Sequence, residues 1–307
     1  MATYELLQVD AFTDRPLGGN PCAVLFDTDE MDAATMLAIA KEMNLSETAF
    51  VRRSEVADPS SRPEGVRASF GVRYFTPAEE IPLAGHPTIA TTFALIDTGR
   101  LKLSGGQTTI TLELQVGPIE VEIFSEGGHI ERIVMSQKKP QFLSTHDPAE
   151  VMPIFGLSPR DALPNVPIQT VSTGTPQLMI AVRDHEVLRR IQVDVVAYSE
   201  YRARSDFFSP HLFCLGGVTE AGGTFARHFG VPPDTPEDPF TGSATGGMAA
   251  YLWRHSLIEE PIFVAEQGHW MNRPGLATVE VVGPREDIKT VKVGGQAVTV
   301  MRGKLVI

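Results

Sequence analysis

Two short segments place a glycine, a proton-carrying side chain and a threonine directly before an apolar run. The first reads Ala84-Gly85-His86-Pro87-Thr88, and the second reads Thr241-Gly242-Ser243-Ala244-Thr245. The apolar runs predict helices that begin after Gly85 and Gly242. Free amide groups at a helix N-terminus, together with the helix dipole, can bind a carboxylate or an enolate-like oxygen. An ordinary tight turn with a threonine cap is the alternative for either segment alone, and finding two such turns favours the ligand site.

Glu47 is one candidate for a general base. It lies in Asn44-Leu45-Ser46-Glu47-Thr48, between a predicted helix stop at Asn44 and an apolar strand. A carboxylate at the mouth of a buried strand loses water, which raises its pKa towards the working pH. Such a group can take a proton as a base and return it as an acid. A solvent-facing glutamate at a strand edge is the alternative, and the residue pattern alone favours that alternative.

Three further side chains near the two turns could take part. His86 could donate to a substrate or relay a proton near neutral pH, and a helix-capping or core histidine is an equal alternative. Asp238 precedes Pro239 and lies four residues before Gly242, while Ser243 follows that glycine. Aspartate before proline commonly starts a turn and serine often caps a helix, so both residues also have purely structural interpretations.

Several other chemistries fail on residue spacing. Ser243 has Thr241 and Thr245 where a nucleophile elbow needs glycines. The eight histidines form no pair typical of a zinc site, and the sequence contains neither a dinucleotide-binding fingerprint nor a Walker A motif. A two-thiol racemase would need a cysteine in each turn, whereas the two cysteines are Cys22 and Cys214. We therefore expect proton transfer by carboxylate or imidazole, with no metal and no cofactor.

The two turns also indicate an internal duplication. Gly85 and Gly242 are 242 − 85 = 157 residues apart. A second pair of similar segments, around Gly19 and Gly174, is 174 − 19 = 155 residues apart, and each of these precedes a strand-like run. Two matches in the same order at nearly the same offset favour two copies of one half, each of about 150 residues.

Strand-like alternation dominates the rest of the chain. We predict domains at 1–137 and 138–296, with a last strand at about 297–307 that returns to the first half. A polar segment, Gln137–Pro148, is predicted to be the linker, and Asp32–Glu42 has helical periodicity. The predicted strands are Tyr4–Val9, Ala23–Phe26, Ala49–Arg53, Arg73–Phe75, Thr108–Leu114, Ile119–Phe124, Ile133–Gln137, Ile168–Val171, Leu178–Val182, Phe263–Glu266, Thr278–Val282 and Val298–Ile307.

Composition limits the possible partners. The chain has 307 residues, of which 42% are hydrophobic and 21% charged, and its net charge is −12. That charge argues against nucleic acid, because phosphate binding needs clustered Lys and Arg, but it permits a small anion held by backbone amides. No apolar run approaches the roughly 20 residues of a membrane helix, and the first residues do not resemble a signal peptide. We expect a cytoplasmic protein with no membrane partner.

These residues coincide with the pattern of a known family. The chain resembles the phenazine-biosynthesis PhzF-like family, whose relatives are diaminopimelate epimerase and proline racemase. The resemblance runs nearly from end to end and is most specific where three motifs occur together. Those motifs are Asn44-Leu45-Ser46-Glu47-Thr48, Leu83-Ala84-Gly85-His86-Pro87-Thr88 and Glu237-Asp238-Pro239-Phe240-Thr241-Gly242-Ser243.

The resemblance implies an α+β fold of two similar domains, each a barrel-like curved mixed sheet around a central helix, with the active site between them. It also implies a homodimer, with Glu47 as the principal base and acid. The remaining residues that it places at the site are His86, Asp238 and Ser243 as catalytic groups, and Asn20, Gly85, Thr241 and Gly242 as substrate contacts.

We therefore expect a cofactor-independent isomerase that moves a proton on a small carboxylated substrate. Trans-2,3-dihydro-3-hydroxyanthranilate is the substrate that the resemblance suggests, and Ala84 before Gly-His slightly favours it. One alternative is a racemase or epimerase of an amino or hydroxy acid, with Asp238 or His86 as the second acid–base group. A further alternative is a non-catalytic small-molecule-binding protein. Arg227-His228-Phe229 departs mildly from the family pattern.

Overall fold

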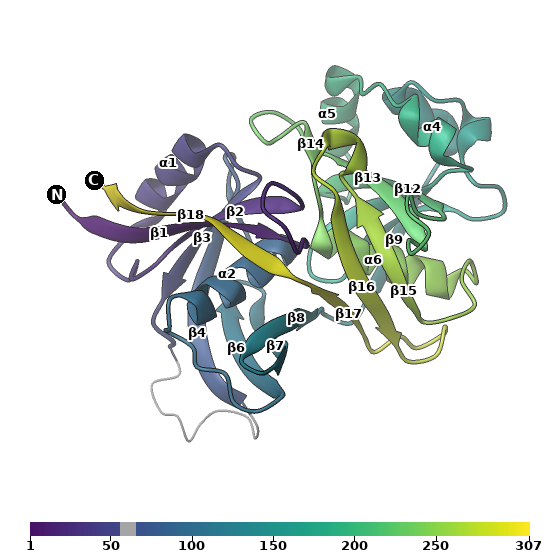
Figure 1. Ribbon diagram of the computed structural model, residues 1–307. Helices are drawn as coiled ribbons and strands as arrows, with labels where there is room; N and C mark the ends of the chain where they lie inside the picture. Colours follow the sequence, from purple (N-terminus) through teal and green to yellow (C-terminus); the bar gives the residue numbers. More distant parts are fainter. Residues whose placement is uncertain (56–65) are drawn as a thin grey trace. The chain divides into compact units, whose positions relative to one another are not determined.

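The computed structural model describes residues 1–55 and 66–307 and shows a mixed, sheet-rich fold. The chain forms two compact units (Figure 1). Unit 1 comprises residues 1–136 and 293–307, and unit 2 comprises residues 137–292. Within the described residues, no helix is both long and apolar enough to cross a membrane.

Unit 1 is a mixed sheet with one helix on each face. Strand β1 pairs antiparallel with β18 and β2, β2 runs parallel to β3, and β3 is antiparallel to β4. Strand β4 is antiparallel to β5 and parallel to β6, and β6, β7 and β8 form an antiparallel meander. The bounds are β1 Thr3–Ala11, β2 Asn20–Leu25, α1 Ala33–Met43, β3 Glu47–Arg52, β4 Val66–Phe75, β5 Glu80–Ile81, α2 Gly85–Asp97, β6 Gln107–Leu114, β7 Gly117–Glu126, β8 His129–Ser136 and β18 Ala297–Val306.

The two helices of unit 1 differ in how much of their surface is buried. Helix α2 is apolar and buried along most of its length, and it contacts β1, β2, β3, β8 and β18. Helix α1 is amphipathic and packs Met36 and Ile39 against Phe50 and Phe75, on the sheet's other face. It ends at Asn44, which adopts φ 51° and donates its amide to the Ala40 carbonyl. The predicted helix stop at Asn44 is thus confirmed.

Unit 2 repeats this arrangement with more helical segments around it. Its antiparallel pairs are β9–β10, β10–β11, β12–β13, β13–β14 and β15–β16. Its parallel pairs are β11–β12 and β13–β15. Helix α6 is apolar and contacts β10, β11 and β16. The bounds are β9 Gln141–His146, α3 Pro148–Val151, η2 Met152–Phe155, η3 Pro159–Asp161, β10 Ile168–Ser172, β11 Pro176–Ala181, α4 His185–Arg189, α5 Val195–Ala203, β12 Ser209–Leu215, β13 Thr224–Phe229, β14 Glu237–Asp238, α6 Gly242–Arg254, β15 Ile262–Gln267, η4 His269–Met271 and β16 Gly275–Val282. Strand β17, Thr290–Gly295, begins in unit 2 and ends in unit 1.

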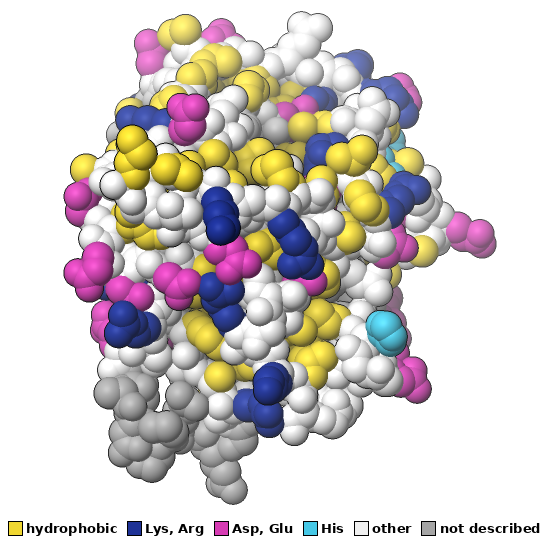
Figure 2. Space-filling view, turned by 60° about the vertical axis from the view of Figure 1, so that its left-hand side comes forward, with side chains coloured by type: hydrophobic (Ala, Val, Ile, Leu, Met, Phe, Trp, Pro, Cys, Tyr) yellow, Lys and Arg dark blue, Asp and Glu magenta, His cyan; other side chains and the backbone are white. Residues whose placement is uncertain are grey.

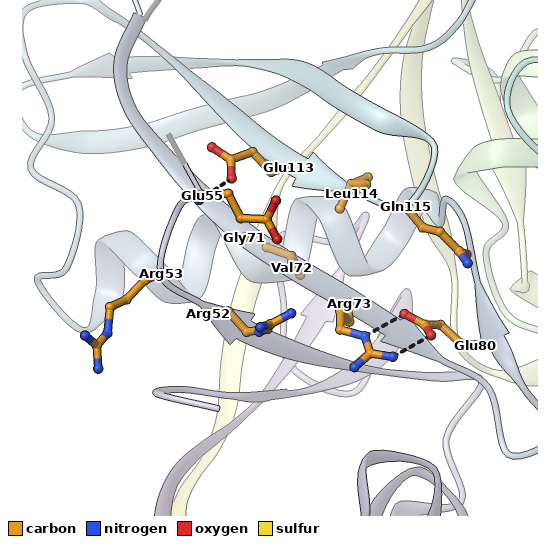
Figure 3. Close-up of a pocket in the computed structure, with 10 residues that line it drawn as sticks. All are labelled: Arg52, Arg53, Glu55, Gly71, Val72, Arg73, Glu80, Glu113, Leu114 and Gln115. Carbon is orange, nitrogen blue, oxygen red and sulfur yellow. Dashed lines mark hydrogen bonds and ion pairs between the residues drawn. The ribbon is translucent and has the colours of Figure 1, made fainter. Parts of the chain in front are cut away.

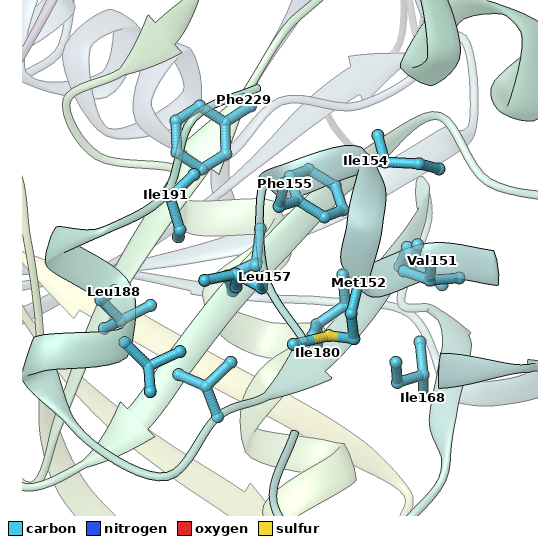
Figure 4. Close-up of a cluster of buried hydrophobic side chains, with 14 of the residues drawn as sticks. Val151, Met152, Ile154, Phe155, Leu157, Ile168, Ile180, Leu188, Ile191 and Phe229 are labelled. Carbon is cyan, nitrogen blue, oxygen red and sulfur yellow. The ribbon is translucent and has the colours of Figure 1, made fainter. Parts of the chain in front are cut away.

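A core of buried apolar side chains fills the space between the unit 2 sheet and its outer helical segments. Phe155 lies between Tyr198 and Phe229, with ring centroids 6.4 and 6.3 Å apart. Figure 4 shows Phe155 and Phe229 among the aliphatic side chains of this cluster, including Met152 and Leu188. Burial of such side chains is the main stabilising contribution to a fold of this kind.

The same salt bridge occurs in both units. In unit 1 the Arg73 guanidinium donates to both Glu80 oxygens, at 2.7 and 2.6 Å, and lies over the Phe75 ring. In unit 2 Arg227 donates to both Glu237 oxygens, at 2.8 and 2.7 Å, and lies over the Phe229 ring. In unit 1 the pair joins β4 to β5, the two-residue strand before α2. In unit 2 it joins β13 to β14, the two-residue strand before α6. Positions in one unit can therefore be matched to counterparts in the other.

Some sequence predictions need correction. The predicted helix starts at Gly85 and Gly242 are confirmed. The segment Gln137–Pro148 was predicted to be a linker, which is wrong because it contains β9, a strand hydrogen-bonded to β10. Strand β4 begins at Val66 rather than Arg73. Strands β12, β13 and β17 were not predicted.

The surface carries charges of both signs. On the face drawn in Figure 2, basic side chains are interspersed with acidic ones and with apolar patches. This mixture is consistent with the net charge of −12.

Candidate active-site residues

Glu47 and His86 meet within unit 1. Glu47 is the first residue of β3, and His86 is the second residue of α2. Glu47 Oε2 lies 3.3 Å from His86 Nε2, and the two side chains are 17% and 2% exposed. A carboxylate that retains some access to solvent is thus placed against a buried imidazole at the N-terminus of the central helix.

His86 is held in a neutral state. Burial lowers its pKa to about 3, and a hydrogen bond with the Pro21 backbone opposes this shift only in part. Asn20 Nδ2 lies 3.0 Å from His86 Nδ1. When the Asn20 amide donates to Nδ1, the neutral ring carries its one proton on Nε2, the nitrogen that faces Glu47. A neutral ring in this state can donate to a substrate, and its role as a proton relay stays a prediction.

The chain holds Asn20 in place through a tight loop. The Leu17 amide donates to Asp10 Oδ2 at 2.7 Å, which closes the loop between β1 and β2. Gly19 has φ 49°, and a Cβ at this position would lie 2.0 Å from the Ala11 carbonyl oxygen. Only glycine fits such a close approach, so Gly19 fixes where β2, and with it Asn20, begins.

Cys22 lies beside Glu47 in the β2–β3 register. It is fully buried, and burial raises its pKa, with the Glu47 charge adding to the effect. A thiol with a raised pKa is a poor nucleophile, because the thiolate is the reactive form. The geometry therefore agrees with the earlier exclusion of thiol-based proton transfer at this site.

The two helix N-termini share one detail. Neither the N-cap residue Ala84 of α2 nor the N-cap residue Thr241 of α6 supplies a side-chain acceptor to the first turn. Thr88 and Thr245 instead donate their hydroxyls to the carbonyls four residues earlier, at 2.7 and 2.9 Å. The alternative of threonine-capped turns is therefore wrong. Binding of a substrate oxygen by amides of the first turn stays a prediction.

Asp238 is fixed within unit 2 by its neighbours. Thr241 Oγ1 donates to Asp238 Oδ2 at 2.5 Å. The Gln267 side chain connects the same segment twice, donating to the Asp238 carbonyl at 2.7 Å and accepting from the Thr241 amide at 3.1 Å. Asp238 is 8% exposed. In this arrangement the Thr241 hydroxyl positions the carboxylate of Asp238.

The Gln137 side chain is hydrogen-bonded to the first residue of α6. Its amide donates to the Gly242 carbonyl at 2.8 Å, and Thr173 Oγ1 donates to Gln137 Oε1 at 2.5 Å. Gly246 leaves room for this side chain, since a Cβ there would lie 1.9 Å from Gln137 Oε1. Ser243 follows Gly242 and is buried.

Sequence reasoning did not identify Gln137, Thr173 or Gln267 as part of the site. Thr173 and Gln267 lie in segments that match the family, so that resemblance was the available signal. Gln137 appeared only as the end of a predicted strand, and its role depends on side-chain packing that the residue pattern does not encode.

The matched positions of the two units carry different chemistry. His86 of unit 1 corresponds to Ser243 of unit 2, since each follows the glycine that begins the central helix. Glu47, the first residue of β3, corresponds to Ser209, the first residue of β12. The scaffold is repeated, whereas the side chains at these two matched positions differ.

Ser209 belongs to a row of buried polar side chains that contact one another. Its hydroxyl donates to Gln177 Oε1 at 2.7 Å and lies 2.8 Å from His228 Nε2, and His228 Nδ1 lies 3.2 Å from His211 Nδ1. Burial lowers the pKa of His228 to about 3 and that of His211 well below its usual value, with His228 adding to the latter shift. Both rings are therefore neutral near pH 7.

Comparison with known proteins identifies the family of the chain. The family model described as "Phenazine biosynthesis-like protein" matches residues 9–303. The chain belongs to this family. Among its relatives is a trans-2,3-dihydro-3-hydroxyanthranilate isomerase from Pseudomonas fluorescens, which is 33% identical over 97% of this chain and 98% of the relative. The resemblance predicted from the motifs is confirmed.

Solved structures extend the comparison. A PhzF-family phenazine biosynthesis protein from Bacillus anthracis covers all of both chains with a TM-score of 0.83 and 30% identity. A hydroxyproline epimerase from Agrobacterium vitis shares the fold, with a TM-score of 0.68 and 11% identity over 99% of this chain and 92% of its own. This family member is an isomerase, as predicted.

Proposed function

We propose that the chain is a cofactor-independent isomerase that moves a proton on a small carboxylated substrate, with Glu47 as the base and acid. The observation that carries the proposal is the contact between the Glu47 carboxylate and the buried, neutral His86 imidazole at 3.3 Å. Glu47 is accessible enough to meet a substrate, and His86 orients it without competing for the proton.

The steps of this proposal use only side chains and amides of the chain. Glu47 removes a proton from a carbon of the substrate, and the electrons move onto a conjugated oxygen or ring position. Amides at the N-terminus of a central helix stabilise the negative charge that develops. Glu47 then returns the proton at another carbon. Asp238, which Thr241 holds in place, and Ser243 are proposed to orient the substrate. Asn20, Gly85, Thr241 and Gly242 are proposed to line its binding site.

The substrate class follows from relatives at 30–33% identity that are named trans-2,3-dihydro-3-hydroxyanthranilate isomerases. We propose this compound, or a similar carboxylated ring, as the substrate. Homodimer formation is also proposed from the family resemblance, and a cytoplasmic location is proposed from the sequence pattern. Light scattering of the purified chain and fractionation of the source cells test these two points.

An epimerase or racemase acting on an amino or hydroxy acid is the second candidate. It is supported by the buried Asp238 carboxylate, which is fixed firmly enough to serve as a second acid–base group. Incubation with substrate in heavy water separates the two candidates. An epimerase inverts the labelled carbon, whereas an isomerase returns deuterium at a different carbon. A non-catalytic binding protein has no support among the relatives, which are named isomerases.

The test of Glu47 is the Glu47→Gln variant. We expect deuterium exchange into the substrate to fall by about 10²–10⁴-fold, because the amide cannot accept the proton. Glu42→Gln, at an exposed position of α1, is the matched control and should keep the wild-type rate. Exchange by Glu47→Gln at close to the wild-type rate would show that another group is the base.

A further inference from the structure

A cavity in unit 1 has the composition of a ligand site. It has a volume of about 340 Å³ and lies where β3, β4 and β6 come together at one end of the sheet. Figure 3 shows Arg52 and Glu55 near the backbone of Gly71, with the Arg73–Glu80 ion pair at one side. Small-molecule sites commonly have volumes of this size.

The cavity is separate from Glu47. Arg52 is the last residue of β3 and Glu47 the first, so five residues at about 3.3 Å each separate them by about 16 Å. Side chains alternate along a strand. Arg52 therefore shares a face with Phe50, which packs in the α1 core, and lies on the face opposite to Glu47. A ligand here would not contact the proposed base.

The cavity exists because of one substitution between the repeated units. Gly71 pairs with Arg52 and Glu113, and its counterpart Phe225 pairs in the same way with Cys214 and Glu266. In unit 2 the Phe225 ring fills this space and lies 4.5 Å from the Trp270 ring. Unit 1 has no side chain at Gly71 and has a guanidinium where unit 2 has a buried thiol. The space that the Phe225 ring fills in unit 2 is thus an open cavity in unit 1, lined by charged side chains.

The charges that line the cavity are only partly matched. Arg73 is occupied by both oxygens of Glu80. The two oxygens of Glu113 accept from Ser54 Oγ and the Glu55 amide, at 2.5 and 2.7 Å.

Arg52 differs from these groups. Its Nε is buried and has no hydrogen-bond acceptor among the residues that the structure describes. A buried donor without an acceptor is costly, so a ligand oxygen at Arg52 would be strongly favoured.

We propose that this cavity binds a small zwitterion of the α-amino acid type, with its carboxylate on Arg52 and its ammonium group on Glu55. A ligand that is only anionic would meet the Glu55 carboxylate, and one that is only cationic would meet Arg52. A molecule that carries both charges can pair with both groups that line the cavity. The cavity is therefore a ligand site independent of the proton-transfer residues.

Isothermal titration of the full chain with three matched probes tests this proposal. L-alanine carries both charged groups, propionate lacks the ammonium group, and ethylamine lacks the carboxylate. We expect binding in the order L-alanine, propionate, ethylamine. Failure of L-alanine to bind at tens of millimolar, or binding of propionate as tight as that of L-alanine, would overturn the proposal.

Variants place the binding at the cavity. Arg52→Gln should weaken L-alanine binding at least tenfold, and Glu55→Gln should remove the preference for L-alanine over propionate. Arg132→Gln is the matched control, because that side chain is exposed on β8 and is not among the residues that line the cavity. Arg52→Lys keeps the charge and serves if Arg52→Gln does not fold; it should bind more weakly than wild type. Binding that persists in both Arg52 variants, or that is lost in Glu47→Gln, contradicts this site.

Discussion

His86 illustrates how the surroundings of one residue decide its chemistry. The residue type and its position beside a helix-opening glycine suggested a group that titrates near neutral pH. Burial lowers its pKa to about 3, so it stays neutral and acts through a single ring proton or lone pair. Its contact with Glu47 is therefore that of a neutral group with a carboxylate, which leaves Glu47 as the one ionisable member of the pair that can exchange a proton with substrate.

This state of His86 predicts the pH dependence of catalysis. We expect His86→Gln to keep the shape of the pH–rate profile between pH 5 and 8, because His86 does not titrate in that range. Glutamine keeps a polar group beside Glu47, whereas leucine does not, so His86→Leu should be about 10–100-fold slower than His86→Gln. Steady-state rates across this pH range measure both effects. Disappearance of a wild-type limb near pH 6 in the glutamine variant would show that His86 is protonated during turnover.

At the residue scale, the sequence predicted the ionisable groups better than the groups that hold them. Glu47 and His86 were identified from their neighbours in the chain, and the structure places them in contact. Gln137 was missed, because it reaches the Gly242 carbonyl across 105 positions of sequence and only through the space left at Gly246. Contacts between distant residues depend on packing, which local patterns do not record.

Some helices and strands could be predicted from the sequence, and others could not. The helices after Gly85 and Gly242 follow from apolar periodicity and a glycine start, and both were predicted. Strand β12 was missed because six of its seven residues are buried, so the alternation that marks a half-exposed strand is absent. Strand β9 was mistaken for a linker because its residues are mostly polar and exposed. Its identity as a strand comes from pairing with β10, which is a tertiary interaction.

The loop between β1 and β2 provides a test at the scale of elements. Gly19→Ala should lower the free energy of unfolding by several kcal/mol, because the new Cβ would lie 2.0 Å from the Ala11 carbonyl oxygen and φ is positive. Gly105→Ala is the control, since Gly105 also has positive φ but has no atom within 4 Å of the new Cβ. It should cost only about 1–2 kcal/mol. Chemical denaturation measures both changes, and equal costs would contradict the steric argument.

Across the whole molecule, buried histidines link stability to pH. His86 and His228 have pKa values of about 3 in the folded chain, and burial also lowers the pKa of His211. The unfolded chain, with ordinary pKa values near 6.5, binds more protons between these limits. Stability is therefore full above about pH 6.5 and is lost as the pH falls towards 3.

We expect the free energy of unfolding to fall from pH 7 to pH 4, by up to about 1.4 kcal/mol per pH unit for each such histidine. His228→Gln should reduce this slope by up to about 1.4 kcal/mol per pH unit. His129→Gln, at an exposed position, should leave the slope unchanged. Urea titrations at several pH values measure the slope. A slope that is the same in wild type and His228→Gln would show that His228 is protonated in the folded state.

Strand β18 has a consequence for how the chain folds during synthesis. It pairs with β1 along nearly its whole length, and Ala2 and Ile307 exchange backbone hydrogen bonds at 2.6 and 3.0 Å. Unit 2 is one continuous stretch of chain, whereas unit 1 is interrupted by it. On the ribosome, every residue of unit 2 emerges before β18 does. The edge of β1 that pairs with β18 therefore stays without its partner strand until synthesis is nearly finished. The half that is translated first is thus the half that is completed last.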